Sequence, residues 1–346
     1  ASFFNRKAKL WIAGRKDVFP KLKNLESGKW IWIHCASLGE FEQGRPIIES
    51  LKSNYSHYKI LLTFFSPSGY EIRKNYSLVE HVSYLPIDTK ENAEKFIELT
   101  QPAFVIFVKY EFWFNYFHEL KKRGISLFIV SAIFRKNQVF FKWYGGFFRK
   151  ILRLVNHFFV QDAESEILLK SIGIKNSTIA GDTRFDRVYN NSLSIKPLDR
   201  IEKFKANSKV LIAGSTWSPD EELLMNLILA LDSISDFKII IAPHEIEKSK
   251  IENLLKMFEK WKAVRYSETS EASISNYNVL IIDNIGMLSS LYGYADYAYI
   301  GGGFGKGIHN ILEAAVFGIP VFFGPNFNKF KEARDLIDHN CAFPVE

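Results

Sequence analysis

The sequence contains little cysteine, no long apolar run and no residue spacing typical of a metal site. Cys35 and Cys341 are its two cysteines, which excludes a disulfide framework and favours a reducing compartment. Because no run of eighteen or more apolar residues occurs, no segment is expected to span a bilayer. CxxC pairs and His–Cys clusters are also lacking, so nothing indicates a structural metal.

The overall composition is that of a globular protein with a basic surface. Of the 346 residues, 47% are hydrophobic and 24% are charged, and this length favours two domains over one. The formal net charge of +7 suits an anionic partner, whether nucleic acid, phosphorylated lipid, acidic sugar or membrane surface. The aromatic share of 15% indicates either a large core or a surface that meets lipid.

Short apolar runs alternate with helix-like segments along the whole chain. This alternation is typical of parallel sheets built from βαβ units, so we predict an α/β protein. The expected strands are 30–36, 59–64, 104–108, 126–130 and 157–160 in the first half, and 209–213, 238–242, 279–282, 297–300 and 320–323 in the second.

The alternation is interrupted at about residues 189–204, where Asn, Ser and Pro accumulate. We interpret this stretch as a linker between an N-terminal domain at 1–188 and a C-terminal domain at 205–346. Two doubly wound domains that face each other form a cleft at the carboxyl ends of both sheets, where ligands bind.

Residues 134–153 combine six basic residues and seven aromatics with no acidic residue. Such a mixture is typical of a segment that lies in the interface of an anionic membrane, with aromatics inserted and cations at the headgroups. The alternative is an ordinary helix that buries its aromatics and solvates a basic face. The density of the mixture favours the membrane interpretation.

Two acidic positions follow predicted strands of the N-terminal domain. Glu40, in the motif Ser37-Leu38-Gly39-Glu40, could accept a proton from an attacking hydroxyl. The residues alone favour a simpler role, a glutamate stabilised at a helix N-terminus. Glu111 comes directly after the run 104–108 and beside Lys109, which fits a site in the cleft and a structural ion pair equally well.

A basic position follows in the segment Gly181-Asp182-Thr183-Arg184. The planar guanidinium of Arg184 could bind a carboxylate or a phosphate, although a turn with a salt bridge is the better interpretation of these residues in isolation. In the C-terminal domain, small residues around Ser215 could let backbone amides approach an anion. A plain turn explains them equally well.

The run Gly301-Gly-Gly-Phe-Gly-Lys-Gly307 follows a predicted strand and precedes a predicted helix. Its amides, with those of residues 310–312, could face a bound phosphate, and Glu313 could bind ribose hydroxyls. The spacing is neither a dinucleotide fingerprint nor a Walker A loop, which argues against a dehydrogenase. A tight turn without ligand is the alternative, and we favour the anion site.

Taken in order, these motifs resemble those of the Kdo transferases, enzymes that attach 3-deoxy-manno-octulosonic acid (Kdo) to the lipid A precursor. The resemblance covers nearly the whole chain. It rests on WIHCASLGE, LTFFSPSGYE, KYEFW, FVQDAES, GDTRFD, the stretch 243–245, IGMLSSLYGYAD and GGGFGKGIHNILEAA. One such motif would be weak, whereas eight in the same order are specific.

The resemblance implies a GT-B glycosyltransferase with CMP-Kdo as donor, a lipid A precursor as acceptor, no metal, no cofactor and no nucleic acid. It also implies an inverting displacement at the ketosidic carbon. By motif position, Glu40 matches the general base, and Glu111 and Arg184 match residues that stabilise the transition state. CMP contacts are expected from Pro243, His244, Ile285, Gly286, Met287, Asn310, Ile311, Leu312 and Glu313, with Ser215 and Gly303 as further candidates.

The chain departs from the family at three of these positions. Arg184 replaces the commoner Lys, which keeps the charge, whereas His244 replaces the commoner Arg and makes its phosphate contact less certain. Met287 replaces the commoner Glu, so a contact there would come from the backbone. Family members usually begin with a hydrophobic anchor and end with further helices, and we expect both to lie outside this sequence. The expected location is the cytoplasmic face of the inner membrane.

Two other classes of protein remain as alternatives. One is a GT-B enzyme that uses a different nucleotide sugar, such as a UDP-hexosamine transferase or epimerase. The other is a non-catalytic peripheral membrane protein that retains a nucleotide-binding fold. The number of sugars transferred, the oligomeric state and the acyl-chain preference leave no recognisable signal in the sequence.

Overall fold

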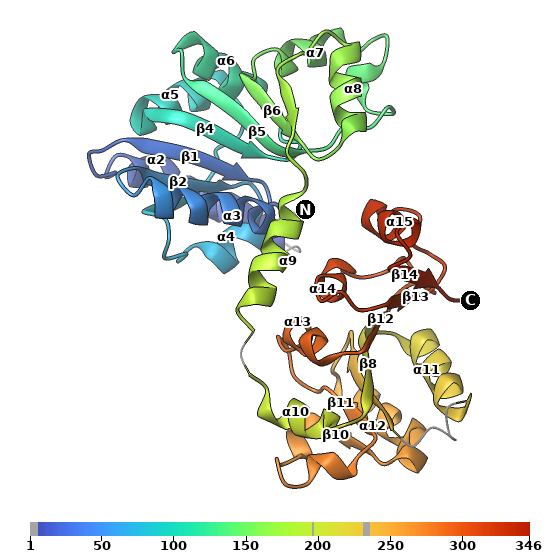
Figure 1. Cartoon of the computed structure of the whole chain (residues 1–346). Coiled ribbons are helices and arrows are strands. Elements are labelled where there is room, and N and C mark those ends of the chain that lie inside the picture. The colour runs from blue at the N-terminus through green and yellow to red at the C-terminus, as the bar shows by residue number, and fades with distance from the viewer. Residues whose placement is uncertain (1–5, 196, 231–235) are drawn as a thin grey trace. The chain divides into compact units, whose positions relative to one another are not determined.

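The protein consists of two compact units, Ala1–Arg187 and Val188–Glu346. The structure is a computed structural model that describes residues 6–195, 197–230 and 236–346. Each unit contains one seven-stranded sheet whose pairings are all parallel. The prediction of an α/β protein with two doubly wound domains is therefore confirmed (Figure 1).

The first sheet has the strand order β3-β2-β1-β4-β5-β6-β7, which begins with the order 3-2-1-4-5-6 of the Rossmann fold. Its strands are β1 (Trp30–Cys35), β2 (Lys59–Phe64), β3 (His81–Tyr84), β4 (Pro102–Val108), β5 (Ser126–Ala132), β6 (His157–Val160) and β7 (Ser177–Ile179). Its helices are α1 (Arg6–Lys16), α2 (Val18–Leu22), α3 (Leu38–Asn54), α4 (Pro67–Arg73), α5 (Lys90–Thr100), α6 (Phe114–Lys122), the 3₁₀-helix η1 (Val139–Phe141), α7 (Gly146–Leu152) and α8 (Ala163–Ser171).

Both faces of the first sheet are buried because side chains alternate along each strand. Trp32 of β1 packs with Phe96 of α5 and Tyr116 of α6 on one face, whereas Ile33 packs with Phe41 of α3 on the other. Figure 1 shows α5 and α6 on one side of this sheet and α3 and α4 on the opposite side. These helices fix the loops that follow β1 and β4.

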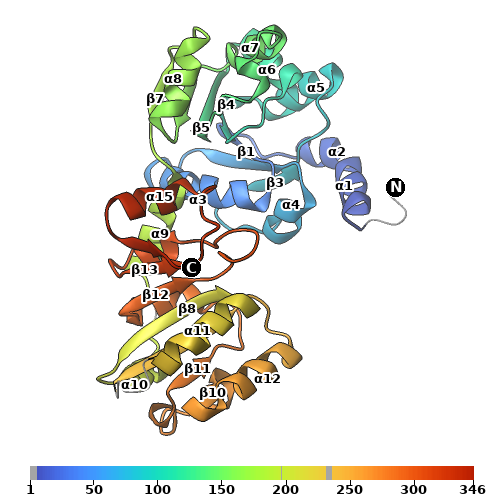
Figure 2. The same ribbon diagram turned by 90° about the vertical axis from the view of Figure 1, so that its right-hand side faces the viewer.

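The second sheet has the order β10-β11-β9-β8-β12-β13-β14. Its strands are β8 (Lys209–Thr216), β9 (Phe237–Pro243), β10 (Ala263–Arg265), β11 (Val279–Ile281), β12 (Tyr297–Ile300), β13 (Val321–Phe323) and β14 (Ala342–Pro344). Helices α11 (Ser218–Ala230) and α12 (Lys248–Met257) cover one face, as Figure 2 shows. The other face packs against α10 (Asp199–Lys205), α13 (Leu288–Leu291), α14 (Leu312–Ala315) and α15 (Lys331–Asp338). Four short 3₁₀-helices complete the unit, η2 (Glu259–Trp261), η3 (Tyr266–Glu268), η4 (Ile274–Asn276) and η5 (Tyr292–Tyr294).

The stretch 189–204, which we interpreted as a linker, contains parts of two helices. Helix α9 (Thr183–Leu193) contains the boundary between the two units, and α10 begins at Asp199. Ile201 and Phe204 of α10 are fully buried in the core of the second unit. Asn190, Asn191 and Ser192 lie in α9, whereas Ser194 and Pro197 lie between the two helices.

Candidate functional site

The predicted site residues follow the strands at which the chain order of each sheet reverses. In the first sheet this reversal falls between the neighbours β1 and β4, and in the second between β8 and β12. Ligands of doubly wound domains bind at the carboxyl ends of such strands. Glu40 and Glu111 follow β1 and β4, and Ser215 and Gly303 lie at the ends of β8 and β12. Each unit therefore presents candidate residues where its topology favours a ligand.

Glu40 closes the first turn of α3 in a capping box with Ser37. Its Oε2 accepts hydrogen bonds from the Ser37 backbone N–H at 2.8 Å and from the Ser37 hydroxyl at 3.2 Å. The side chain is 9% exposed. Burial raises the pKa of Glu40, and the hydrogen bonds from Ser37 oppose that shift. The carboxyl group thus stabilises the helix and also has the raised pKa expected of a base.

Glu111 lies beside Glu40 at the same edge of the sheet. Burial raises the pKa of Glu111 to about 7, and the nearby carboxyl of Glu40 adds to the increase. Carboxyl groups whose pKa values are raised by burial and by a neighbouring carboxyl group occur frequently at acid–base sites.

Arg184 is the second residue of α9, whose first residue contacts the end of β5. The hydroxyls of Thr183 and Ser131, at the end of β5, lie 3.0 Å apart, and Arg184 pairs with Asp182 at 2.7 Å. The salt bridge that we considered as the alternative for this segment is present. It leaves the guanidinium 41% exposed, so the group is accessible at the site.

Lys109, which the sequence analysis did not select, also belongs to this group. Burial lowers the pKa of Lys109, as does the charge of Arg184, whereas Asp182 and Glu40 raise it. The first unit thus brings Glu40, Glu111 and Arg184 together with an additional ammonium group. Lys109 lies within the motif KYEFW, which was the available signal.

The backbone is strained at the strand ends that form the sites. Seven residues other than glycine have positive φ, and four of them, Gln101, Ala206, Lys262 and Asn340, end helices, where this conformation is ordinary. The other three are Lys109 (φ 69°), Ser131 (φ 51°) and Ser215 (φ 55°), at the ends of β4, β5 and β8. Such strain concentrates at functional sites.

In the second unit, three aromatic side chains from different loops form a stack. The ring centroids of Trp217 and His244 are 4.6 Å apart, and those of His244 and His309 are 4.5 Å apart. The indole Nε1 of Trp217 also donates to His309 Nε2 at 3.2 Å. The stack adds Trp217 and His309 to the predicted His244. A small polar pocket of about 70 Å³ beside it is lined by Pro243, Thr216 and Lys250, among others.

Several backbone amides of the glycine-rich loop donate hydrogen bonds to other groups of the protein. The amide of Gly301 donates to Gly214, the amide of Gly302 to the carboxylate of Asp220, and the amides of Gly305 and Gly307 to Gly302. These four amides are therefore engaged within the protein, and they do not face a ligand as we expected of the loop. A Cβ on Gly303 would lie 2.6 Å from the backbone of Gly324, so close packing alone explains that glycine.

The remaining predicted contacts differ in how accessible they are. Ile285 is 88% exposed and is followed by Gly286 with φ 97° and by Met287, which precedes α13. Ile311 and Leu312 are buried in the core, and the Leu312 amide donates to Asn310 Oδ1 at 3.3 Å. Their side chains are thus unavailable to a nucleotide.

The polar residues around them lie nearer to the surface. Asn310 Nδ2 donates to Glu313 Oε1 at 2.8 Å, and Asn310 is exposed. This pair is the accessible part of the segment 310–313.

Residues 134–153, which we call the basic aromatic segment, are neither one helix nor fully exposed. Phe134 and Phe140 are buried, whereas the aromatic side chains of Trp143, Tyr144, Phe147 and Phe148 are exposed by 91%, 59%, 54% and 40%. The Arg149 guanidinium donates to the carbonyls of Phe140 and Lys142 at 3.1 and 2.8 Å. The segment therefore combines a structural interior with an exposed aromatic surface.

The loop that carries Glu111 packs against this segment. The ring centroid of Phe112 lies 5.1 Å from that of Phe140, and the centroid of Phe114 lies 5.3 Å from that of Phe147. The exposed aromatics therefore lie next to the loop of a predicted catalytic residue.

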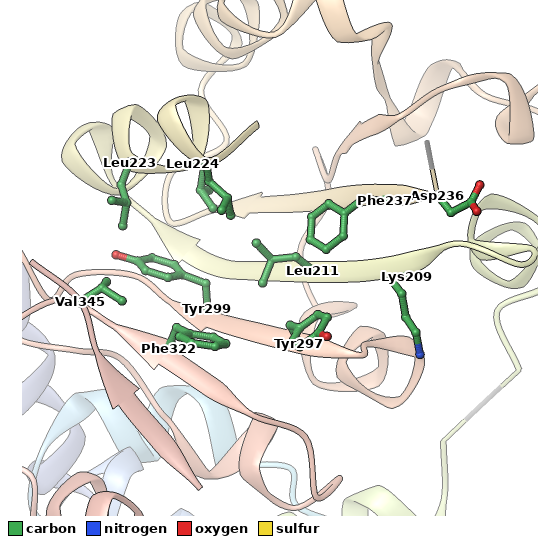
Figure 3. A pocket seen from close by; sticks show the side chains of 11 residues that line it. Lys209, Leu211, Leu223, Leu224, Asp236, Phe237, Tyr297, Tyr299, Phe322 and Val345 are labelled. Atoms are coloured by element: carbon green, nitrogen blue, oxygen red, sulfur yellow. The ribbon is translucent and has the colours of Figure 1, made fainter. Parts of the chain in front are cut away.

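An apolar pocket of the second unit lies away from these residues. Figure 3 shows it on the face of the sheet beside α11, lined by apolar side chains such as Leu211, Tyr299 and Phe322. Its volume is about 570 Å³, and its charged residues are Lys209 and Asp236 at one end. Lys209 pairs with Asp296 at 2.9 Å, and the lining is mostly apolar.

The described residues contain neither a helix that could span a membrane nor a group of side chains that could bind a metal ion. Over 6–195, 197–230 and 236–346, no helix is long and apolar enough to traverse a bilayer. In the same part of the chain, no three His, Cys, Asp or Glu side chains are grouped so that they could bind a metal ion.

Two Rossmann-like domains, each with polar side chains where its strand order reverses, form the GT-B fold, which is found in enzymes that act on nucleotide sugars. The model of the family described as "3-Deoxy-D-manno-octulosonic-acid transferase (kdotransferase)" matches residues 12–187, more than half of the chain. The chain belongs to this Kdo transferase family.

Individual relatives agree with this membership. A "3-deoxy-D-manno-octulosonic acid transferase" of Aquifex aeolicus is 28% identical over 94% of this chain and 85% of that protein. A "Bifunctional glycosyltransferase/methyltransferase" of Fusobacterium nucleatum is 26% identical over 99% of this chain. The chain spans only 54% of the length of that relative.

The solved structures show the fold alone. A UDP-GlcNAc 2-epimerase of Methanocaldococcus jannaschii superposes with a TM-score of 0.59 over 92% of this chain and 89% of that one, at 15% identity. An identity this low supports the two-domain architecture and does not transfer a substrate.

Proposed function

We propose that the protein transfers Kdo from CMP-Kdo to a lipid A precursor, with inversion at the ketosidic carbon and without a metal ion. The observation that carries this proposal is the buried carboxyl of Glu40, whose pKa is raised and which lies beside Glu111, Lys109 and Arg184. Membership of the Kdo transferase family supports the choice of sugar.

The proposed reaction is a single displacement. The Glu40 carboxylate accepts the proton of a glucosamine hydroxyl, whose oxygen attacks the ketosidic carbon as the bond to the CMP phosphate breaks. CMP leaves with the bonding electrons. Positive charge that develops on the sugar is stabilised by the Glu111 carboxylate, and Arg184 balances the negative charge of the departing phosphate.

In the proposed reaction, the second unit binds the nucleotide. The stack of Trp217, His244 and His309 offers aromatic surface and histidine N–H groups. Asn310 and Glu313 offer polar groups for the phosphate and ribose.

The substitution Glu40→Gln tests the role of Glu40 because glutamine can also complete a capping box. We expect the melting temperature to be kept and transfer to fall by about 10²–10⁴-fold, the usual contribution of a general base. The assay uses CMP-Kdo generated in situ and a tetraacylated lipid A precursor, with products weighed by mass spectrometry.

A matched variant separates the helix cap from the base. Ser37→Ala removes the hydroxyl from the cap, which costs about 1 kcal/mol, and leaves the carboxylate in place. It should melt at a lower temperature and still transfer sugar. Transfer by Glu40→Gln at the wild-type rate would rule out Glu40 as the base, and wild-type protein without transfer would rule out the function.

We also propose that the basic aromatic segment binds the anionic cytoplasmic face of the inner membrane. The exposed side chains of Trp143, Phe147 and Phe148 support this, as do the exposed cations Arg135 and Lys150. Contact between Phe114 and Phe147 links this surface to the Glu111 loop, where a lipid acceptor would be needed.

Sedimentation with anionic vesicles tests the membrane proposal. The variant Trp143→Ala/Phe147→Ala/Phe148→Ala should bind at least about tenfold more weakly, because each buried aromatic contributes on the order of 1–3 kcal/mol. CMP binding should be unchanged. The control Tyr55→Ala/Ile72→Ala alters side chains that are 52% and 59% exposed elsewhere in the first unit. Equal binding by both variants would refute the proposal.

A further inference from the structure

We propose that Lys109 binds the carboxylate of the transferred sugar acid and so orients its ketosidic carbon toward Glu40. This inference rests on the proposed function and adds a substrate-binding residue to it.

The position of Lys109 is fixed by the strands around it. Lys109 directly follows β4, which pairs with β1 on one side and β5 on the other. Its backbone N–H donates to the carbonyl of Val130 in β5 at 2.9 Å. The first turn of α3, which contains Glu40, follows β1 at the same edge. The strand order therefore places Lys109 beside the loop of Glu40. The 3.0 Å contact between the hydroxyls of Ser131 and Thr183 brings the start of α9, with Arg184, to the end of β5 on the other side.

The backbone at Lys109 has a conformation that glycine adopts more readily. With φ 69° the residue is in the left-handed region, where a Cβ is unfavourable. No helix ends there, so the usual reason for this conformation does not apply. A lysine at this position costs stability, and a role for its side chain in binding accounts for it.

The ammonium group is surrounded by charges but has no close carboxylate. No ion pair within 4.0 Å joins Lys109 Nζ to a carboxylate in the described part of the chain, and its recorded contact is the Tyr110 ring, 5.5 Å away. Asp182 is already paired with Arg184, and Glu40 is bound to Ser37. A half-buried cation in such surroundings favours an anion from outside the protein.

The chemistry of the sugar supplies that anion. Kdo is an octulosonic acid, so its carboxylate is attached directly to the ketosidic carbon at which transfer occurs. A cation that binds this carboxylate beside the general base fixes the reacting carbon within reach of the attacking hydroxyl. Sugars without the carboxylate would lose this contact, which makes Lys109 a determinant of specificity.

The test compares steady-state constants for three variants with those of the full wild-type chain. Lys109→Met removes the charge and keeps the length of the side chain. Lys109→Gly removes the side chain and relieves the positive φ. Lys121→Met is the control, because Lys121 is an exposed lysine of α6 in the same unit.

We expect Lys109→Met and Lys109→Gly to raise the KM for CMP-Kdo by about ten- to a hundredfold, the loss typical of one charged hydrogen bond. The KM for the lipid acceptor and the Kd for CMP should not change. Lys109→Gly should melt at the wild-type temperature or above it, and Lys121→Met should match the wild type throughout.

Other outcomes overturn the inference. A larger KM for the acceptor with an unchanged KM for the donor would assign Lys109 to an acceptor phosphate. If Lys109→Met and Lys109→Gly melt at lower temperatures and keep the wild-type KM values, Lys109 has a structural role and does not bind the sugar. If wild type transfers Kdo and Lys109→Met does so with the same constants, the inference fails alone. If wild type transfers none, the proposed function fails and the inference with it.

Discussion

Two neighbouring carboxyl groups in the first unit have different surroundings. Glu40 accepts two hydrogen bonds from Ser37, which partly offset the effect of burial on its pKa. For Glu111, burial and the Glu40 charge both act to raise the pKa, which reaches about 7. Glu111 therefore changes its charge near neutral pH.

This difference predicts the pH dependence of transfer. A Glu111 carboxylate is needed to stabilise positive charge on the sugar, so kcat/KM should rise as the pH increases through about 7 and Glu111 ionises. Glu111→Gln should be about 10²–10³-fold slower above that pH and should lose this limb of the profile. Initial rates between pH 5.5 and 8.5 measure both effects. A variant that retains the wild-type profile would show that another group titrates.

Single residues of the site were predictable to different degrees. Glu40, Glu111 and Arg184 were selected by motif, and the structure brings them to one edge of the first sheet. Their roles stay predictions. The stack of Trp217, His244 and His309 was missed because it forms only when the ends of β8 and β9 meet the glycine-rich loop. The spacing of these three residues along the sequence does not show that their side chains come into contact.

At the scale of elements, all ten predicted strands are present, and the four that were missed are the edge strands of both sheets, β3, β7, β10 and β14. Central strands are buried on both faces and appear as continuous apolar runs. An edge strand such as β7 is short and mostly exposed, so its sequence lacks that signal.

The glycine-rich loop allows a prediction about an element. Gly303→Ala places a Cβ 2.6 Å from the Gly324 backbone, so we expect a loss of about 1–3 kcal/mol in the free energy of unfolding. In Gly305→Ala the nearest atom to the new Cβ is the Gly302 carbonyl oxygen at 3.6 Å, an ordinary contact. Urea unfolding compares the two. Equal stabilities would mean that the loop adapts without cost.

At the scale of the whole molecule, each unit has its own sheet, its own core and its own candidate residues. The division at 187/188 follows from the contacts within the chain, whereas the assignment of acceptor and donor to separate domains remains a prediction. The fold class was predictable because alternating strands and helices leave few topologies. The donor was predicted from the resemblance of the motifs and not from the fold, because one fold serves many different substrates.

Melting curves with two nucleotides test the donor. A ligand that binds only the native state stabilises it, by about 2.7 kcal/mol at a hundredfold excess over Kd. We expect CMP to raise the melting temperature more than UDP at equal concentration, and His244→Ala to reduce the CMP effect. A larger increase with UDP would favour the alternative GT-B enzymes over a Kdo transferase.

The capping box at Glu40 links catalysis to the mechanics of a helix. In the proposed reaction, the oxygen that accepts the Ser37 N–H belongs to the group that captures a proton in each cycle. A protonated acid accepts hydrogen bonds less well than its anion, so each turnover would loosen the first turn of α3 until the proton leaves. The helix would then tighten and relax in step with the reaction, and ordering of residues 37–40 would report the protonation state of the enzyme.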